Sequence, residues 1–185
     1  NVAEKAGQDV SQAFKLSNAL SPDLQYYRLS ILPSLLDKVH MNIKAGNDEF
    51  TLFEIGKGHH VDVMGKDALP SEFGRVGGVY ASRNESDGAT YYQIKHTVEY
   101  LIRQLRSDAT ISYTRLDEYE APDFKPFTQM LAPFDPVRSA IVEIDGKLAG
   151  VVGEPRAKVI RNFKLPAATG IFELFLSPFE QSPAA

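Results

Sequence analysis

The sequence predicts an α+β fold in which helices pack on an antiparallel sheet. Three observations support this class: two stretches show helical apolar spacing, several others alternate in the manner of strands, and an Asp-Gly pair separates two alternating runs. Helix-like and strand-like stretches do not alternate regularly along the chain, and hairpins dominate instead. A doubly wound parallel sheet is therefore disfavoured.

The first long helix is predicted to begin at Leu32. A proline inside a helix costs about 3 kcal/mol, so Pro33 looks out of place. With Ser30 as the N-cap, however, Pro33 falls in the first turn, where amide groups have no intrahelical partner. Ala45-Gly46 provides a stop signal. One apolar stripe of this helix contains Leu32, Leu35, Leu36, Val39 and Ile43.

A second, longer helix is expected over Thr90–Arg106, because its apolar residues share one face and its polar residues lie elsewhere. A short third helix is expected over Arg156–Phe163. Between them lies the clearest hairpin, in which Ser139–Ile144 and Lys147–Gly153 flank the turn Asp145-Gly146. An Asp-Gly pair between alternating runs is one of the stronger local signals for a hairpin.

Strand-like alternation elsewhere completes the predicted sheet. In F-T-L-F-E-I-G, residues 50–56, Phe53 and Ile55 share one face while Leu52 and Glu54 share the other. A proline-spaced loop, with prolines at 122, 126, 133 and 136, is expected before the hairpin. The predicted strands outside the hairpin are Gln12–Ser17, Phe50–Gly56, Gly74–Ser82, Thr110–Leu116 and Gly170–Leu176.

Composition limits the class of protein. The 185 residues suit one domain or two small ones, and no run approaches the roughly 20 apolar residues of a membrane span. A net charge of −4 argues against a stand-alone nucleic-acid binder. The absence of cysteine excludes disulfides and cysteine–zinc sites, and it fits a reducing compartment. A start at Asn1 rather than methionine is expected of a fragment excised from a longer protein.

The search for catalytic motifs gives mostly negative results. There is no G-x-S-x-G, no G-x-x-x-x-G-K-[ST] phosphate loop and no H-E-x-x-H. His59-His60 with Asp62 could approach a metal ion, but neighbouring strand residues point to opposite faces. An exposed loop is therefore the favoured interpretation, and the sequence predicts no catalytic, cofactor-binding or metal-binding residue.

Two sets of charged residues have a structural and a functional interpretation. The basic set could touch a phosphate backbone, although a solvated helix face is favoured. It contains Arg156, Lys158, Arg161 and Lys164. The acidic set would indicate a site if it faced the core, but positions outside the sheet or beside arginines are favoured. It contains Glu54, Glu143, Glu154 and Glu173.

Several motifs resemble the β subunit of bacterial-type phenylalanyl-tRNA synthetase. L-S-N-A-L-S-P-D-L-Q-Y-Y-R-L-S-I-L-P-S-L-L followed by L-F-E-I-G-K-G is similar to that family's N-P-L-S-x-(D/E)…R-x-S-L-L-P-G-L-L…L-F-E-I-G pattern. Y-Q-I-K-H-T-V-E-Y-L-I, D-P-V-R-S-A, A-G-V-V-G-E and G-I-F-E-L-F-L resemble later motifs of the family in the same order. The resemblance spans nearly the whole chain.

The resemblance implies a single catalytic-like module, residues 1–185, of a longer β subunit with the class II synthetase catalytic fold. In the family this module performs no chemistry. A catalytic α subunit holds ATP, phenylalanine and the tRNA end, and two αβ pairs form a cytoplasmic heterotetramer. ATP and magnesium are therefore expected in the parent complex and not in this fragment.

The resemblance also implies candidate contact residues. The proline-containing helix resembles the helix that class II domains use at their subunit interface. The expected interface residues are Arg28, Pro33, Leu36, His40 and Arg138. Possible RNA-facing residues are Arg156, Lys158 and Arg161.

The residue inventory supports an inactive module. A working class II site needs arginines that hold phosphates and carboxylates that hold magnesium. The family supplies them from F-R-x-E and G-x-G-x-x-R segments. In this sequence Phe53 is followed directly by Glu54, without an arginine, and G-I-F-E-L-F-L contains no arginine either.

Some positions depart from the family pattern. Proline, glycine and histidine of the family are replaced by Ala19, Ser34 and Asp135, and two further glycines are replaced by His96 and Val137. These departures leave open an alternative function. The chain would then be a free-standing diverged paralogue that binds a small molecule, such as an amino acid, in the inherited cleft.

Overall fold

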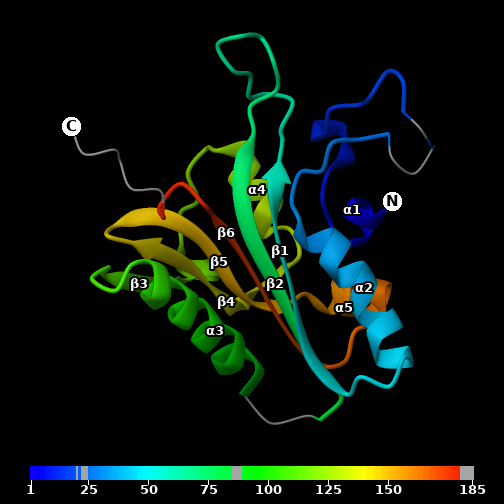
Figure 1. Ribbon diagram of the computed structural model, residues 1–185, viewed down its shortest axis with the longest axis vertical. Helices are drawn as coiled ribbons and strands as arrows, with labels where there is room; N and C mark the ends of the chain where they lie inside the picture. The colour runs from blue at the N-terminus through cyan, green and yellow to red at the C-terminus, as the bar shows by residue number, and fades with distance from the viewer. Residues whose placement is uncertain (20, 22–24, 85–88, 180–185) are drawn as a thin grey trace.

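A computed structural model describes residues 1–19, 21, 25–84 and 89–179. Its centre is a six-stranded sheet in the order β1-β2-β6-β5-β4-β3, and every neighbouring pair is antiparallel (Figure 1). The strands are β1 Glu49–Gly58, β2 Phe73–Ser82, β3 Ile111–Arg115, β4 Phe134–Ile144, β5 Lys147–Pro155 and β6 Ala168–Phe175. The predicted α+β class with an antiparallel sheet is confirmed.

The helices cover the two faces of the sheet unequally. They are α1 Val2–Lys5, α2 Leu32–Lys44, α3 Ala89–Leu105, α4 Lys125–Leu131 and α5 Ala157–Phe163, with 3₁₀ turns at Val10–Gln12 and Leu116–Glu118. One face, here the α2 face, packs against α2, α4 and α5, whereas the opposite α3 face packs against α3 (Figure 1).

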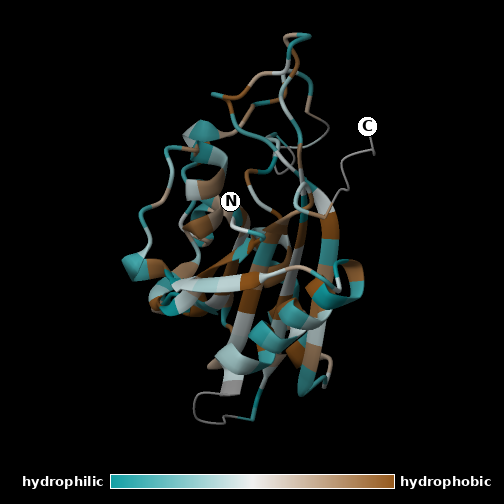
Figure 2. Cartoon of the chain, turned by 90° about the vertical axis from the view of Figure 1, so that its left-hand side faces the viewer, coloured by the Kyte–Doolittle hydropathy of each residue, from teal (hydrophilic) through white to brown (hydrophobic). Residues whose placement is uncertain are grey.

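Each face has its own apolar core. On the α2 face, Leu32, Leu36 and Val39 of α2 pack with inward residues of the strands, among them Val79 and Ile171. Complete burial of each such side chain stabilises the fold by about 1.5–3 kcal/mol. On the α3 face, the core combines residues of α3 with alternate strand residues. It contains Ile94, Val98, Ile102, Val142, Ile144, Val152, Phe172 and Leu174. In Figure 2 hydrophobic residues recur along the strands of the sheet.

The start of α2 explains its proline. Pro33 lies in the first turn, as predicted, and α2 ends at Lys44, just before the positive φ of 92° at Gly46. The predicted N-cap is wrong, because the cap residue is Ile31. The hydroxyl of Ser30 donates to the buried carboxylate of Glu173 and accepts from the amide of Leu32, the first residue of α2.

The hairpin and the other main elements confirm the predictions within a few residues. Asp145 and Gly146 both have positive φ, 52° and 72°, as a tight two-residue turn between β4 and β5 requires. β4 begins earlier than predicted, at Phe134, and its pairing with β5 contains register shifts. α3 forms as predicted, although Leu105 at its end is exposed.

Two predictions near the prolines and the N-terminus are wrong. Gln12–Ser17 is not a strand of the sheet; apart from the 3₁₀ turn, it contributes one isolated bridge between Lys15 and Tyr26. The proline-spaced loop contains α4, which the sequence interpretation missed. Pro126 lies in the first turn of α4, as Pro33 does in α2, and Phe127 and Met130 are fully buried.

β1 is the terminal strand of the sheet and alternates as predicted. Phe53 and Ile55 are 73% and 66% exposed, whereas Leu52 and Glu54 on the other face are partly buried. Ile55 is directly opposite Val76, which belongs to the core of the α3 face. The two exposed side chains therefore extend that face at its open edge. In the described part of the chain, no helix is long and apolar enough to cross a membrane.

Candidate functional site

The motif arginine, Arg28, lies between the extended segment before α2 and strand β1. Its Nη1 is 2.5 Å from Oε1 of Glu54, and its Nε donates to the carbonyl of Lys57 at 3.0 Å. Its own carbonyl accepts from the amide of His59 at 2.9 Å. The side chain remains 38% exposed. Arg28 therefore joins the motif segment to β1 and still has surface to offer a partner.

A second arginine–glutamate pair lies in the core of the α2 face. Arg75 of β2 and Glu173 of β6 are both fully buried, with Nη1 and Oε1 3.0 Å apart. Glu173 also accepts from the Ser30 hydroxyl at 2.5 Å and from the Ile31 amide at 3.3 Å. Arg75 Nη2 donates to the carbonyl of Pro126. One ion pair thus connects two central strands with the starts of α2 and α4.

The electrostatics of this pair follow from its burial. Desolvation lowers the pKa of Arg75, and the adjacent Glu173 carboxylate opposes that effect. The guanidinium also lies 4.9 Å from the ring centroid of Phe175, a cation–π contact. A buried charge is tolerated only when it is paired and hydrogen-bonded, which both partners here achieve for most of their polar atoms. Arg75 Nε is an exception among the described residues.

The two glycines of the L-F-E-I-G-K-G motif lie under these arginines. A Cβ at Gly58 would be 2.7 Å from Arg75 Nε and 2.8 Å from the carbonyl oxygen of Leu29. A Cβ at Gly56 would instead meet the end of the flexible Arg28 side chain. The motif glycines therefore give the guanidinium groups room against the β1 backbone.

His59 and His60 lie in a loop after β1, as predicted, but the predicted exposure is wrong, because both histidines are buried. His59 stacks on Tyr27 with ring centroids 4.6 Å apart, and burial lowers its pKa against the opposing effect of Glu72. Burial likewise lowers the pKa of His60, whose Nδ1 accepts from the Asp62 amide. Among the described residues, no group of three or more His, Cys, Asp or Glu side chains could hold a metal ion.

The interface candidates occupy different environments. Arg28 and Pro33 line one cavity beside the start of α2. Pro33 is largely buried and Leu36 is entirely buried in the core, so Leu36 can affect a partner only through the packing of α2. His40 is half-buried on the same helix. Arg138 lies on β4, 70% exposed, and pairs with Glu154 at 3.0 Å. An interface role for these residues stays a prediction.

The basic set and the acidic set defined from the sequence largely occupy the positions that the favoured interpretation predicts. Arg156, Lys158, Arg161 and Lys164 are all exposed on or beside α5. Three of the four strand carboxylates lie beside arginines: Glu54, Glu154 and Glu173. The fourth, Glu143, accepts from the Ser112 hydroxyl. Only the complete burial of the Glu173 pair was missed. Its inward position follows the alternation with Ile171 and Phe175 on β6.

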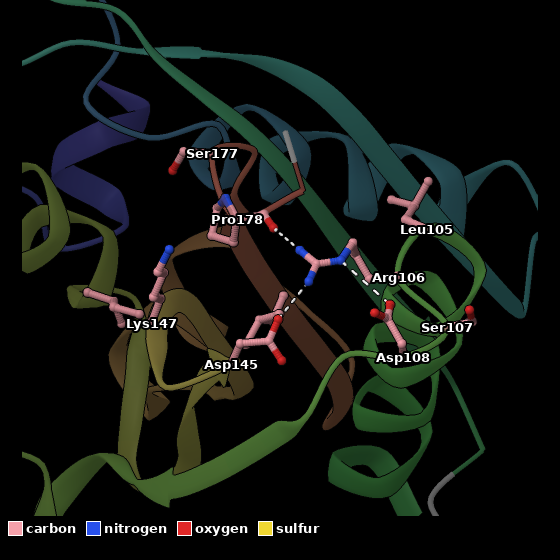
Figure 3. Close-up of a pocket in the computed structure, with 10 residues that line it drawn as sticks. Leu105, Arg106, Ser107, Asp108, Asp145, Lys147, Ser177 and Pro178 are labelled. Carbon is pink, nitrogen blue, oxygen red and sulfur yellow. Dashed lines mark hydrogen bonds and ion pairs between the residues drawn. The ribbon is translucent and has the colours of Figure 1, made fainter. Parts of the chain in front are cut away.

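A hollow of about 800 Å³ lies at the end of α3 (Figure 3). Arg106 extends across it, with Nη1 donating to the carbonyl of Pro178 and Nη2 2.6 Å from Oδ2 of Asp145. Asp145 also accepts from the amide of Thr110, which lowers the pKa of the aspartate. These contacts join α3, the hairpin turn and the segment after β6. The hollow is thus a structural junction.

The sheet and its flanking helices have the catalytic fold of class II aminoacyl-tRNA synthetases. Two solved structures of pyrrolysyl-tRNA synthetase from Desulfitobacterium hafniense share it. One has a TM-score of 0.63 at 11% identity and covers 96% of this chain and 56% of that one. The other has a TM-score of 0.56 at 12% identity and covers 91% and 52%. At these identities the likeness shows the fold alone.

The chain belongs to the family described as the phenylalanyl tRNA synthetase beta chain CLM domain, whose model matches residues 1–176. Phenylalanine–tRNA ligase beta subunits are its relatives. The Streptococcus thermophilus protein is 24% identical over 97% of this chain, the Cupriavidus pinatubonensis protein 28% over 91%, and the Thermococcus kodakarensis protein 26% over 94%. The chain spans 22%, 20% and 26% of their respective lengths.

Proposed function

We propose that the chain is a non-catalytic assembly module of a phenylalanyl-tRNA synthetase β subunit that pairs with the catalytic α subunit. The observation that carries this proposal is the family match over residues 1–176. We take residues 1–185 as one module of a longer, cytoplasmic protein. Its parent complex would be a heterotetrameric ATP-dependent ligase, with phenylalanine, ATP, magnesium and tRNA bound mainly by other parts.

The arginines of the sheet support a non-catalytic role. Strands β1, β5 and β6 contain none, although phosphate-holding arginines belong on motif strands of an active class II site. The arginine of β2, Arg75, is fully buried and paired with Glu173. Such a guanidinium is not available to a nucleotide phosphate. The chain alone should therefore catalyse no phenylalanine-dependent exchange of pyrophosphate into ATP.

Surface features beside α2 support pairing through this region. Arg28 is partly exposed next to Tyr26 and Tyr27, which are 40% and 42% exposed. Tyrosine and arginine are enriched at protein interfaces and among the residues that dominate their binding energy. We therefore place the contact with the α subunit at the start of α2, with His40 further along the same helix.

Co-expression with the α subunit from the same genome tests the proposal. We expect the two chains to co-purify as a stable complex. Failure to co-purify, together with binding of phenylalanine to the free chain in calorimetry, would contradict it. That result would support the second candidate, a diverged paralogue that binds an amino acid.

The exposed basic set gives a secondary role in tRNA contact. Arg156, Lys158 and Arg161 have no ion-pair partner among the described residues, so their charges are available to a phosphate backbone. Replacing all three by glutamine should lower tRNA affinity of the reconstituted complex and flatten its salt dependence. Unchanged affinity and an unchanged salt slope would leave these residues as a solvated helix face.

A further inference from the structure

Strand β1 ends the sheet, and half of its backbone hydrogen-bonding groups face away from β2 (Figure 1). In an antiparallel pair, alternate residues bond to the neighbouring strand and the others point outward. The amide of Arg83 donates to the carbonyl of Asp48 in continuation of the β1–β2 ladder, so the even-numbered residues of β1 are the ones bonded to β2. The odd-numbered residues therefore present their backbone groups at the edge: Glu49, Thr51, Phe53, Ile55 and Lys57.

The segment before α2 covers only the last part of this edge. Arg28 Nε donates to the outward carbonyl of Lys57, and the carbonyl of Arg28 accepts from the amide of His59 beyond the strand. Between Glu49 and Ile55, no hydrogen bond joins an outward amide or carbonyl to another residue that the structure describes. Outward groups of this kind are a template for a further strand.

The side chains of the same five residues lie on the α3 face and are all exposed. Phe53, the middle one, is 73% exposed, and its neighbour on that face, Ile55, is 66% exposed. Glu49 lies four residues before Phe53, and Lys57 lies four residues after it. The strand thus has an apolar centre with a carboxylate on one side and an ammonium at the same distance on the other. Such an order is complementary to itself when it is reversed.

The charges distinguish the possible registers of β1 against a reversed copy of itself. Pairing of the outward groups requires odd-numbered residues opposite odd-numbered ones, so the centre of the pairing falls on a residue. Centred on Leu52, the pairing places the carboxylate of Glu49 opposite an apolar side chain. Centred on Glu54, it places two carboxylates opposite each other, which is unfavourable. Centred on Phe53, it places Glu49 opposite Lys57, and this register alone of the three pairs opposite charges.

We propose that β1 pairs with β1 of a second copy of this chain, antiparallel about a two-fold axis at Phe53, which joins the two six-stranded sheets into one. Glu49 then faces Lys57 of the partner subunit, and the two Phe53 rings meet at the axis. Thr51 faces Ile55 of the partner subunit. The pairing satisfies the outward backbone groups and removes exposed apolar surface from water. It goes beyond the assembly role, which requires only the α subunit.

Cysteine cross-linking tests the register, because the chain has no cysteine of its own. Residues directly opposite each other in a hydrogen-bonded antiparallel pair have Cα atoms about 5.5 Å apart, within the range of a disulfide. Under mild oxidation, Phe53→Cys should therefore form a covalent dimer on non-reducing gels. Thr51→Cys should not, because its own copy lies about 13 Å away along the strand. The double variant Thr51→Cys, Ile55→Cys should cross-link again. Cross-linking of Phe53→Cys no faster than that of Thr51→Cys overturns the proposal.

Charge reversal provides an independent test that leaves the apolar centre intact. In sedimentation equilibrium, Glu49→Lys should weaken the dimer by about tenfold, since like charges then face each other twice. Adding Lys57→Glu should restore the wild-type affinity, whereas the exposed control Lys147→Glu should leave the affinity unchanged. Lys57 also pairs with Glu72, and Glu49 accepts from the Tyr80 hydroxyl, so the melting temperature of each variant checks the fold.

Two outcomes of the sedimentation experiment overturn the proposal. One is a wild-type chain that stays monomeric up to millimolar concentration. The other is a folded double variant that dimerises no better than Glu49→Lys alone. The assay contains no α subunit, so these outcomes are separate from failure of the assembly role.

Discussion

Two arginine–glutamate pairs on the α2 face use the same chemistry in different surroundings. Arg28 and Glu54 are 38% and 30% exposed and connect a surface segment to the terminal strand β1. Arg75 and Glu173 are fully buried and connect β2 to β6. Water screens the first pair, so it contributes little to stability, whereas the second depends on its protein partners for every interaction.

Because of this difference, the buried pair can fix the fold, whereas the exposed pair is accessible to a partner. Removing one member of the buried pair leaves a charge in the core without compensation. Loss of Arg75 also leaves the Pro126 carbonyl without its donor, and loss of Glu173 leaves Ser30 and Ile31 without their acceptor. Removing one member of the surface pair leaves the other solvated. We therefore expect the buried pair to control stability and the surface pair to control assembly.

The largest effect is expected from Arg75→Met. It leaves the Glu173 carboxylate buried without its cation, so the free energy of unfolding should fall by about 3–5 kcal/mol in urea titrations. The double variant Arg75→Met, Glu173→Leu should recover part of this loss, because no unpaired charge remains. An unfolding free energy of Arg75→Met within about 1 kcal/mol of the wild type would show that the pair does not fix the fold.

The next largest loss of stability is expected from substitutions of the two motif glycines, Gly56 and Gly58. Gly58→Ala places a methyl group against Arg75 and the Leu29 carbonyl, neither of which can move away easily. The expected loss is about 1–3 kcal/mol. Gly56→Ala meets the ends of two flexible side chains, Arg28 and Glu54, and should cost less. Thermal unfolding of the matched variants measures the difference, and equal losses would remove the distinction between the two arginine sites.

The pH dependence of stability tests the two buried histidines that lie near the arginine–glutamate pairs. The backbone amide of His59 donates to the Arg28 carbonyl, and His60 lies near Arg75. Burial lowers the folded-state pKa of both histidines below 6.5. The unfolded chain then binds more protons as pH falls below 6.5, so stability is lost in that direction. The slope should be at most about 1.4 kcal/mol per pH unit for each histidine.

Histidine substitutions check the origin of this slope. His60→Gln should flatten the dependence of the unfolding free energy on pH between about 6.5 and 5. His96→Gln, which changes an exposed side chain, should leave it as in the wild type. A slope that survives substitution of both buried histidines would assign the acid sensitivity to other groups.

The smallest effect on stability is expected from Arg28→Ala, less than about 1 kcal/mol, because its ion pair is exposed. Its effect on co-purification with the α subunit should be larger than that of Arg115→Ala, an exposed and paired arginine at the opposite edge of the sheet. If the two variants co-purify equally well with the α subunit, Arg28 has no role in assembly and makes contacts only within this chain. Arg138→Ala, assayed by ligase activity of the complex, tests the second interface candidate.

Periodicity predicted the elements that bury a regular apolar stripe or face. α2, α3 and the hairpin all combine such a pattern with a start, stop or turn signal. α4 was missed because its prolines suggested a loop, although Phe127 and Met130 have helical spacing after a proline in the first turn. Gln12–Ser17 alternates over only a short stretch and forms one isolated bridge, between Lys15 and Tyr26, instead of joining the sheet.

The site was less predictable, because its parts come from distant segments. Arg75 and Glu173 are 98 residues apart, and local alternation indicates an inward side chain without naming its partner. The burial of His59 depends on the segment before α2, through the Tyr27 ring and the Arg28 carbonyl. Such contacts are fixed by tertiary packing, which no short-range pattern contains.

The open edge of the sheet has a consequence for handling the isolated chain. β1 displays Phe53 and Ile55 to water on the last strand of the sheet. A terminal strand that also carries large exposed apolar side chains is a template for pairing with another strand. Concentrated solutions of the free chain should therefore scatter light as oligomers form. A lysine in place of Phe53 should keep the chain monodisperse.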